Sequence, residues 1–223
     1  MPPAVRVAFI HALQASIEPL NAALDEAWPE VERMHVLDDS LSRDRARGAA
    51  LDGAMQDRFH ALAEYALMAG AQGILFSCSA FGLSIEGVAR RRAPIPVLKP
   101  NEAMIDAVTR LTSRVGVVAT FAPTLEAIVT EFPPQTQLRC VLAKGAMAAL
   151  AAGDMAHHDA LIAEASASLV DDGCEVIALS QFSMARARAV VEAAVSVPVY
   201  TTVDSAVQLM RTRMIDCVPE ARV

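Results

Sequence analysis

The chain repeats itself, and this internal repeat restricts its fold more than any other feature. The segment starting Arg6-Val-Ala-Phe-Ile-His aligns position for position with the segment starting Arg114-Val-Gly-Val-Val-Ala. In this register Ser16 falls on Thr124 and Glu18 on Glu126. Further along, the apolar run 176–179 aligns with the apolar run 74–76 of the first repeat, and residues 197–201 align with residues 95–99. The chain is therefore a tandem repeat of a unit of roughly 100 residues, a usual domain size.

Each repeat alternates short apolar runs with segments of helical periodicity. Residues 6–11 and 73–76 have the unbroken apolar pattern of strands buried on both faces, whereas 55–69 have a helical spacing. Alternation of strands and helices predicts an α/β fold with parallel sheets covered by helices. We expect two pseudo-symmetric halves, residues 1–112 and 113–223, with the C-terminal helix a candidate to pack on the first half.

The active-site cleft is expected between the halves, because ligands bind at the carboxyl ends of parallel strands. Residues 38–53 are charged and irregular. They are interpreted either as a loop or loosely held helix over the site, or as a solvated face.

Composition and charge exclude several classes of protein. Hydrophobic residues make up 54% and aromatic residues 4%, so the core must consist mainly of aliphatic side chains. A net charge of -7 argues against a nucleic-acid groove, which needs Lys and Arg. No apolar run is long enough to span a membrane. Irregularly spaced cysteines without CxxC predict reduced thiols, a cytoplasmic protein and no structural zinc or other metal site.

Cys78 is the candidate catalytic residue. It follows the apolar run 73–76 and precedes a turn and a helix, so we expect it at the carboxyl end of a strand. Backbone N–H groups at a helix N-terminus predict a lowered thiol pKa, and a thiolate can exchange protons or attack a double bond. A buried structural cysteine is the alternative. The other thiols, Cys140, Cys174 and Cys217, are interpreted as structural.

The sequence around Cys78 is similar to a known family. Ile74-Leu-Phe-Ser-Cys78-Ser79 resembles the first cysteine motif of the aspartate/glutamate/hydantoin racemase superfamily. Gly153-Asp154, residues 172–179 and Met184-Ala185 resemble the motif of its second half. The resemblance covers nearly the whole chain and implies a cofactor-independent enzyme. In such enzymes two thiols face opposite sides of a carbon next to a carboxylate, one removing a proton and the other returning one.

This chain departs from the family pattern at the second thiol. The motif there reads Leu179-Ser180-Gln181-Phe182-Ser183-Met184-Ala185, so Gln181 occupies the position of the second cysteine. Cys174 precedes the strand, near the opposite end of the sheet, and cannot easily replace it. Gln181 has no proton to exchange near neutral pH, and we assign it a binding role with Ser183 beside it.

Further residues are candidates for the site. His11 ends the first strand and is the best alternative second acid or base, and a structural histidine is the other interpretation. Ser79, Ala80 and Phe81 offer backbone N–H groups to a carboxylate or enolate. The resemblance places carboxylate binding at the matching turn of the second half, which holds Thr120, Phe121 and Thr124. Helix capping is the alternative for Thr124 and for Asn101, which otherwise orients substrate, and Ser16 is interpreted as a helix cap. His157 and His158 are interpreted as solvated.

Three functions remain open from the sequence. The first is a racemase or isomerase acting at a carbon α to a carboxylate or carbonyl, with Cys78 and His11 as its acid and base. The second is a single-cysteine decarboxylase or lyase of the arylmalonate decarboxylase type, which one thiol suits better. The third is a non-catalytic protein that binds small acids. The expected partner is a small carboxylate-bearing substrate, without nucleic acid or membrane, and apolar helix faces are compatible with a homo-oligomer.

Overall fold

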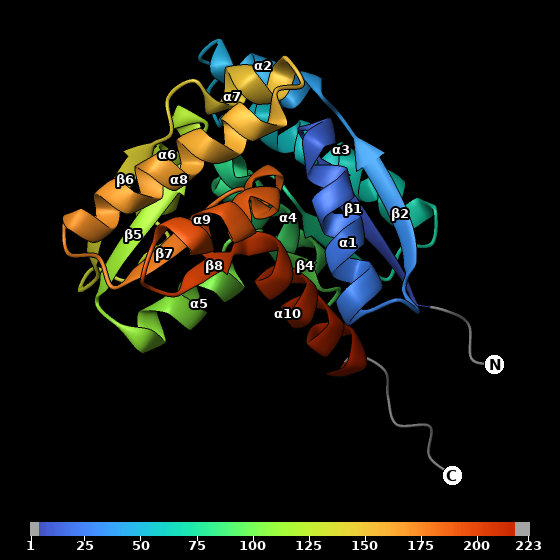
Figure 1. Cartoon of the computed structure of the whole chain (residues 1–223). Helices are drawn as coiled ribbons and strands as arrows, with labels where there is room; N and C mark the ends of the chain where they lie inside the picture. The colour runs from blue at the N-terminus through green and yellow to red at the C-terminus, as the bar shows by residue number, and fades with distance from the viewer. Residues whose placement is uncertain (1–4, 217–223) are drawn as a thin grey trace.

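The computed structural model describes residues 5–216, which form two parallel four-stranded sheets flanked by helices (Figure 1). The strand order is β2-β1-β3-β4 in the first sheet and β6-β5-β7-β8 in the second. Every neighbouring pair of strands is parallel. The two sheets have the same topology, which confirms the predicted pseudo-symmetric α/β architecture.

The elements of the first repeat follow the predicted alternation. They are β1 (Arg6–His11), α1 (Ile17–Ala27), β2 (Glu32–Leu37), α2 (Ser40–Ala46), α3 (Gly53–Met68), β3 (Gly73–Phe76), α4 (Gly82–Arg92), β4 (Val97–Leu98) and α5 (Glu102–Leu111). Short 3₁₀ turns cover Gln14–Ser16 and Ser79–Phe81. The charged segment 38–53 contains the short helix α2, and Arg58 of α3 binds Asp38 just before this helix and Asp44 within it.

The second repeat reproduces this order. Its elements are β5 (Arg114–Ala119), α6 (Ala122–Val129), β6 (Gln137–Leu142), α7 (Ala146–Ala151), α8 (Met155–Asp171), β7 (Val176–Leu179), α9 (Arg188–Ala194), β8 (Val199–Thr201) and α10 (Thr202–Asp216), with a 3₁₀ segment over Phe182–Ala187 between β7 and α9. Within residues 5–216, no helix combines the length and the apolar character needed to cross a membrane.

The two halves exchange their last helices. The buried side chains of α10, among them Val207 and Met210, pack in one cluster with Val7 and Phe9 of β1. Conversely, Met104 and Val108 of α5 pack with β5 and β7 of the second sheet. Each sheet therefore has one face covered by a helix from the other repeat, and the cores do not divide at residue 112.

Candidate active site

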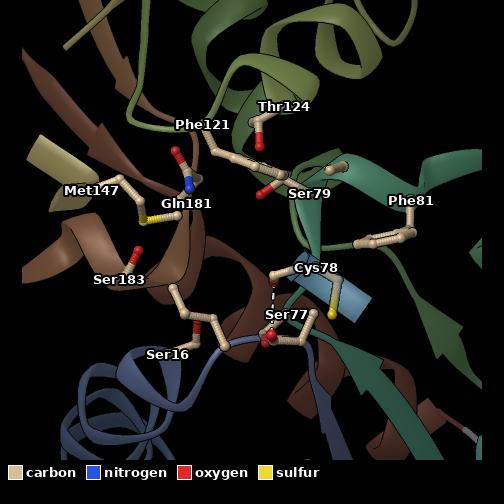
Figure 2. Close-up of a pocket in the computed structure, with 14 residues that line it drawn as sticks. Ser16, Ser77, Cys78, Ser79, Phe81, Phe121, Thr124, Met147, Gln181 and Ser183 are labelled. Atoms are coloured by element: carbon tan, nitrogen blue, oxygen red, sulfur yellow. Dashed lines mark hydrogen bonds between the residues drawn. The ribbon is translucent and has the colours of Figure 1, made fainter. Parts of the chain in front are cut away.

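Cys78 lies in a small pocket between the two halves. The pocket is lined from the first half by residues around Cys78 and after β1, and from the second half by residues after β5, β7 and in α7. It encloses an empty volume of about 380 Å³, including its opening. Figure 2 shows Gln181, Ser183 and Met147 across this space from Cys78. We call it the Cys78 pocket.

Cys78 and Gln181 occupy equivalent positions in the two repeats. Ser77 N–H donates to Ile10 O at 3.0 Å, and Ser180 N–H donates to Val118 O at 3.1 Å. Cys78 follows the first of these serines and Gln181 the second. The alignment of the sequence is thus confirmed by geometry, and the position facing the thiol belongs to an amide.

The Cys78 thiol is protonated at neutral pH. Its side chain is 5% exposed, and this burial raises its pKa to about 12. The Ala12 backbone N–H acts in the opposite direction but does not offset burial. The sequence-based prediction of a lowered pKa is therefore wrong, because the desolvation of a buried thiolate outweighs the few N–H groups that face it. The resting thiol is a proton donor, not a base.

Gln181 presents hydrogen-bond donors to the pocket. Its Oε1 accepts the Thr120 backbone N–H at 2.6 Å and the Thr120 hydroxyl at 3.1 Å. A backbone N–H can only donate, so the oxygen of the amide is fixed at Thr120 and the NH₂ group is left for a ligand. Thr120 itself does not line the pocket and acts by holding Gln181.

Most of the predicted site residues line the Cys78 pocket. They are Cys78, Ser79, Ala80, Phe81, Phe121, Thr124, Gln181 and Ser183. The Ser79 hydroxyl donates to Ser180 O at 2.7 Å, so one hydrogen bond joins the two halves directly at the site. The hydroxyl of Ser183 is buried and, among the described residues, has no hydrogen-bond partner. An unpaired buried hydroxyl at a pocket wall is well placed to meet a ligand.

His11 lies behind the pocket wall rather than in it. It is fully buried, and its Nδ1 and Nε2 are hydrogen-bonded to Ser77 Oγ at 2.8 Å and to His35 Nδ1 at 3.0 Å. Burial, reinforced by His35, lowers the pKa of His11 to about 3. The imidazole is neutral at physiological pH, and its contact with the pocket passes through Ser77.

Asn101 is also absent from the pocket lining. It is fully buried at the start of α5, and within the part of the chain that the structure describes neither atom of its amide has a hydrogen-bond partner. Its side chain does not cap α5.

The capping alternatives for two pocket residues are wrong. Thr124 lies inside α6 and Ser16 makes no side-chain capping bond, yet both line the Cys78 pocket. His158 is likewise not solvated, because it is fully buried and bonded to Asp159 at 2.7 Å. Cys140 and Cys174 lie outside the pocket lining, and Cys217 falls outside the described residues.

Several lining residues were not singled out from the sequence as substrate contacts. They are Ala12, Leu13, Ser16, Ser42, Ser77 and Met147. Ser77 precedes the cysteine and could have been found from its place at the same strand end. Ser42 lies on α2, whose place over the site was one of two open interpretations. Met147 on α7 carried no recognisable signal.

A second, apolar chamber adjoins the Cys78 pocket. It shares Leu13, Ser42, Phe121 and Met147 with the pocket and extends between α2 and α7, which lie together at the top of Figure 1. It opens widely to solvent, its empty volume is about 1010 Å³ including that opening, and Gln14 and Arg43 are its other polar members besides Ser42. Among residues 5–216, no group of three or more His, Cys, Asp or Glu is arranged to hold a metal ion.

The fold is shared with solved racemase structures. Glutamate racemase from Francisella tularensis superposes with a TM-score of 0.74 at 12% identity, covering 95% of this chain and 81% of that one. Allantoin racemase from Klebsiella pneumoniae gives 0.67 at 19%, covering 95% and 88%. A Gly74Cys mutant of arylmalonate decarboxylase gives 0.65 at 16%, covering 97% and 96%. A search of curated proteins finds no significant match.

The family assignment rests on the sequence itself. Residues 14–210 match the family model described as Asp/Glu/Hydantoin racemase. This range includes Cys78, Gln181 and nearly all of both repeats. The chain belongs to the Asp/Glu/hydantoin racemase family.

Proposed function

We propose that the protein is a cofactor-independent enzyme that transfers a proton at the carbon α to a carboxylate, with Cys78 as the acid. The observation that carries the proposal is a single protonated thiol in the Cys78 pocket, opposite the fixed NH₂ group of Gln181. A neutral thiol can protonate an enolate, and buried N–H donors stabilise the carboxylate that remains.

One-sided protonation is the reaction that this arrangement favours. In decarboxylation the C–C bond to the leaving carboxylate breaks, carbon dioxide departs and the electron pair stays on the α-carbon as an enolate. The Cys78 S–H bond then breaks and a C–H bond forms on one face. The thiolate regains its proton from water, which closes the cycle without a second acid.

Racemisation or isomerisation is the second candidate, favoured by the family of the chain. It needs a group that exchanges protons on the other face of the substrate. Gln181 and Ser183 stand there, and neither titrates near neutral pH. His11 lies behind Ser77, on the same wall as Cys78, and so does not reach the other face.

The test is the fate of the α-hydrogen. The full-length protein is incubated in deuterated water with α-substituted malonates, such as phenylmalonate and methylphenylmalonate, and with amino acids and hydantoins. We expect monocarboxylate product with one deuterium at the α-carbon and, from methylphenylmalonate, a single enantiomer. Cys78→Ala should abolish the reaction, whereas Cys140→Ala, which removes a thiol outside the pocket, should retain it.

Two outcomes contradict this proposal. A racemic product, or deuterium exchange into an amino acid or hydantoin without loss of carbon dioxide, would favour the racemase. Binding of small acids to both wild type and Cys78→Ala, without turnover of any compound, would identify a non-catalytic binding protein.

A further inference from the structure

The hydrogen of the Ser77 hydroxyl is directed away from the pocket by a chain of hydrogen bonds. Arg33 Nη1 lies 3.4 Å from Asn21 Oδ1. Because a guanidinium only donates hydrogen bonds, the atom of the Asn21 amide that faces Arg33 is its oxygen. His35 Nε2 lies 3.1 Å from the same oxygen and must donate to it. Burial lowers the pKa of His35 as well as that of His11, so both rings are neutral, with one donor and one acceptor each.

The donor and acceptor of each further hydrogen bond follow from the position of the Asn21 amide oxygen. Since His35 donates through Nε2, its Nδ1 accepts from His11 Nε2–H at 3.0 Å. His11 Nδ1 then has only a lone pair, which accepts the Ser77 hydroxyl at 2.8 Å. Ser77 lines the pocket, and the lone pairs of its oxygen are all it can offer to a ligand.

Two other hydroxyls of the first-half wall are committed in the same way. Ser42 donates to Ala12 O at 2.7 Å, and Ser79 donates to Ser180 O at 2.7 Å. Ser42, Ser77 and Ser79 therefore all present acceptors. Across the pocket, Gln181 presents its NH₂ group, and the Ser183 hydroxyl is unpaired among the described residues.

We infer that the Cys78 pocket selects a carboxylate whose α-carbon bears a neutral hydrogen-bond donor such as a hydroxyl, because donors face it from the Gln181 wall and acceptors from the Ser77 wall. The inference deepens the proposed function, on which it rests for placing the α-carbon next to Cys78. The carboxylate binds Gln181 and Ser183, and the α-hydroxyl donates to Ser77.

An ammonium group on the α-carbon does not fit this pocket. Within the described chain, none of the lining residues carries a charge. Asp38, whose charge acts on Cys78, does not line the pocket and is held by Arg58 at 2.7 Å. An ammonium would find no carboxylate in the lining, whereas a neutral hydroxyl needs only the acceptors that are present, so hydroxy acids are favoured over free amino acids. The third substituent extends into the apolar chamber through the shared residues Phe121 and Met147.

Four probes that differ only at the α-carbon test the inference. They are mandelate, phenylacetate, phenylglycine and phenylglyoxylate, which carry a hydroxyl, a hydrogen, an ammonium and a keto oxygen. Binding to the wild-type protein is measured by calorimetry, with both enantiomers where they exist. We expect one enantiomer of mandelate to bind about fivefold more tightly than phenylacetate, the factor that one hydrogen bond contributes. Phenylglyoxylate should bind more weakly than phenylacetate, since its oxygen faces an acceptor, and phenylglycine should not bind.

Variants of the chain separate the direction of the bonds from simple packing. Ser77→Ala should make mandelate and phenylacetate equal. In His35→Phe the ring of His11 is free to carry its hydrogen on Nδ1 and donate to Ser77, whose own hydrogen can then enter the pocket. The rejection of phenylglyoxylate should therefore be relieved, an effect that loss of packing alone does not produce. His60→Gln, a histidine of α3 that does not line the pocket, should match wild type.

Phenylglycine bound as tightly as mandelate, phenylglyoxylate bound equally well, or no binding of any probe would overturn the inference. The outcome is separable from that of the proposed function. Selective binding of mandelate without turnover of malonates would support this inference and contradict the proposed function. Turnover of malonates without the predicted selectivity would support the proposed function and contradict this inference.

Discussion

The backbone N–H of Thr120 donates to Gln181 Oε1 at 2.6 Å, and this contact decides what the pocket offers opposite Cys78. It turns the amide so that its NH₂ group, and not its oxygen, is left for a ligand. The position that resembles a second thiol site has thereby become a fixed donor.

Replacement of Gln181 should show the value of this donor. Gln181→Glu keeps an oxygen at Thr120 but turns a second oxygen into the pocket, where it repels a carboxylate. We expect calorimetric affinity for phenylacetate to fall by more than tenfold. Gln181→Met, which removes the donor without adding charge, should cost about fivefold. Equal affinities in the two variants would contradict the role of the donor.

Alkylation should report the protonation of Cys78. Because burial raises the pKa of the thiol to about 12, its thiolate fraction at pH 7.5 is about a thousandfold below that of an ordinary cysteine. Iodoacetamide should therefore label Cys78 very slowly in the folded protein and rapidly after denaturation, as followed by peptide mass spectrometry. The folded-state rate should still be rising above pH 9, and a plateau between pH 7 and 9 would show a lowered pKa.

Acid should destabilise the fold through His11. Its pKa is about 3 in the folded state and about 6.5 when unfolded, so the unfolded state binds the extra proton first. This contribution to stability is fully present above pH 6.5 and is lost as pH falls toward 3. Between pH 7 and 4.5 it amounts to about 2.5 kcal/mol of unfolding free energy.

Urea unfolding at each pH measures this loss. The matched variant is His11→Gln, whose side chain does not titrate. Between pH 7 and 4.5 its unfolding free energy should therefore fall less than that of the wild type, by the contribution of His11. Parallel curves for the two proteins would show that His11 is not the group responsible.

Two glycine substitutions should separate packing from backbone effects. A Cβ at Gly116 on β5 would lie 3.1 Å from Leu169 Cβ and 3.2 Å from Cys174 Cβ, atoms close to the backbone of the covering α8 segment. Gly116→Ala should therefore lower the free energy of unfolding by about 2 kcal/mol. Gly53→Ala meets nothing within 4 Å at the start of α3 and should be neutral or slightly stabilising.

Lys99 should stabilise the contact between the halves. It pairs with Glu86 of α4 at 2.7 Å and with Glu131, after α6, at 3.4 Å, and its side chain is 17% exposed. Lys99→Met leaves two carboxylates uncompensated and should cost about 3 kcal/mol at pH 7.5. Burial already raises the pKa of Glu131, so protonation should reduce the cost at pH 5. A cost independent of pH would point to lost packing alone.

The fold was predictable because repetition and apolar periodicity are local in the sequence. Arg6 and Arg114 start equivalent strands, and the alignment between them places Gln181 at the position equivalent to Cys78. What the sequence could not supply was the balance of burial and hydrogen bonding around a thiol, which is a property of the assembled interior. The thiol pKa was therefore predicted in the wrong direction.

The same limit explains the other differences at the site. Ser77 and His11 are far apart in the chain, and their bond exists only because β1 and β3 are neighbours in the sheet. Thr124 looked like a helix cap because residue type alone cannot show that a hydroxyl inside a first turn faces a pocket. His158 looked solvated because its burial depends on how α8 packs against its neighbours.

The exchange of α5 and α10 between the halves has a consequence for how the molecule can come apart. A chain cut near residue 112 would yield two fragments, each with a sheet that lacks one helix and a helix that lacks its sheet. Neither fragment could bury its own apolar surface, whereas the two together could complete each other's cores. The interlocked repeats should therefore unfold in one cooperative transition, and reassembly of separate fragments should require both to be present at once.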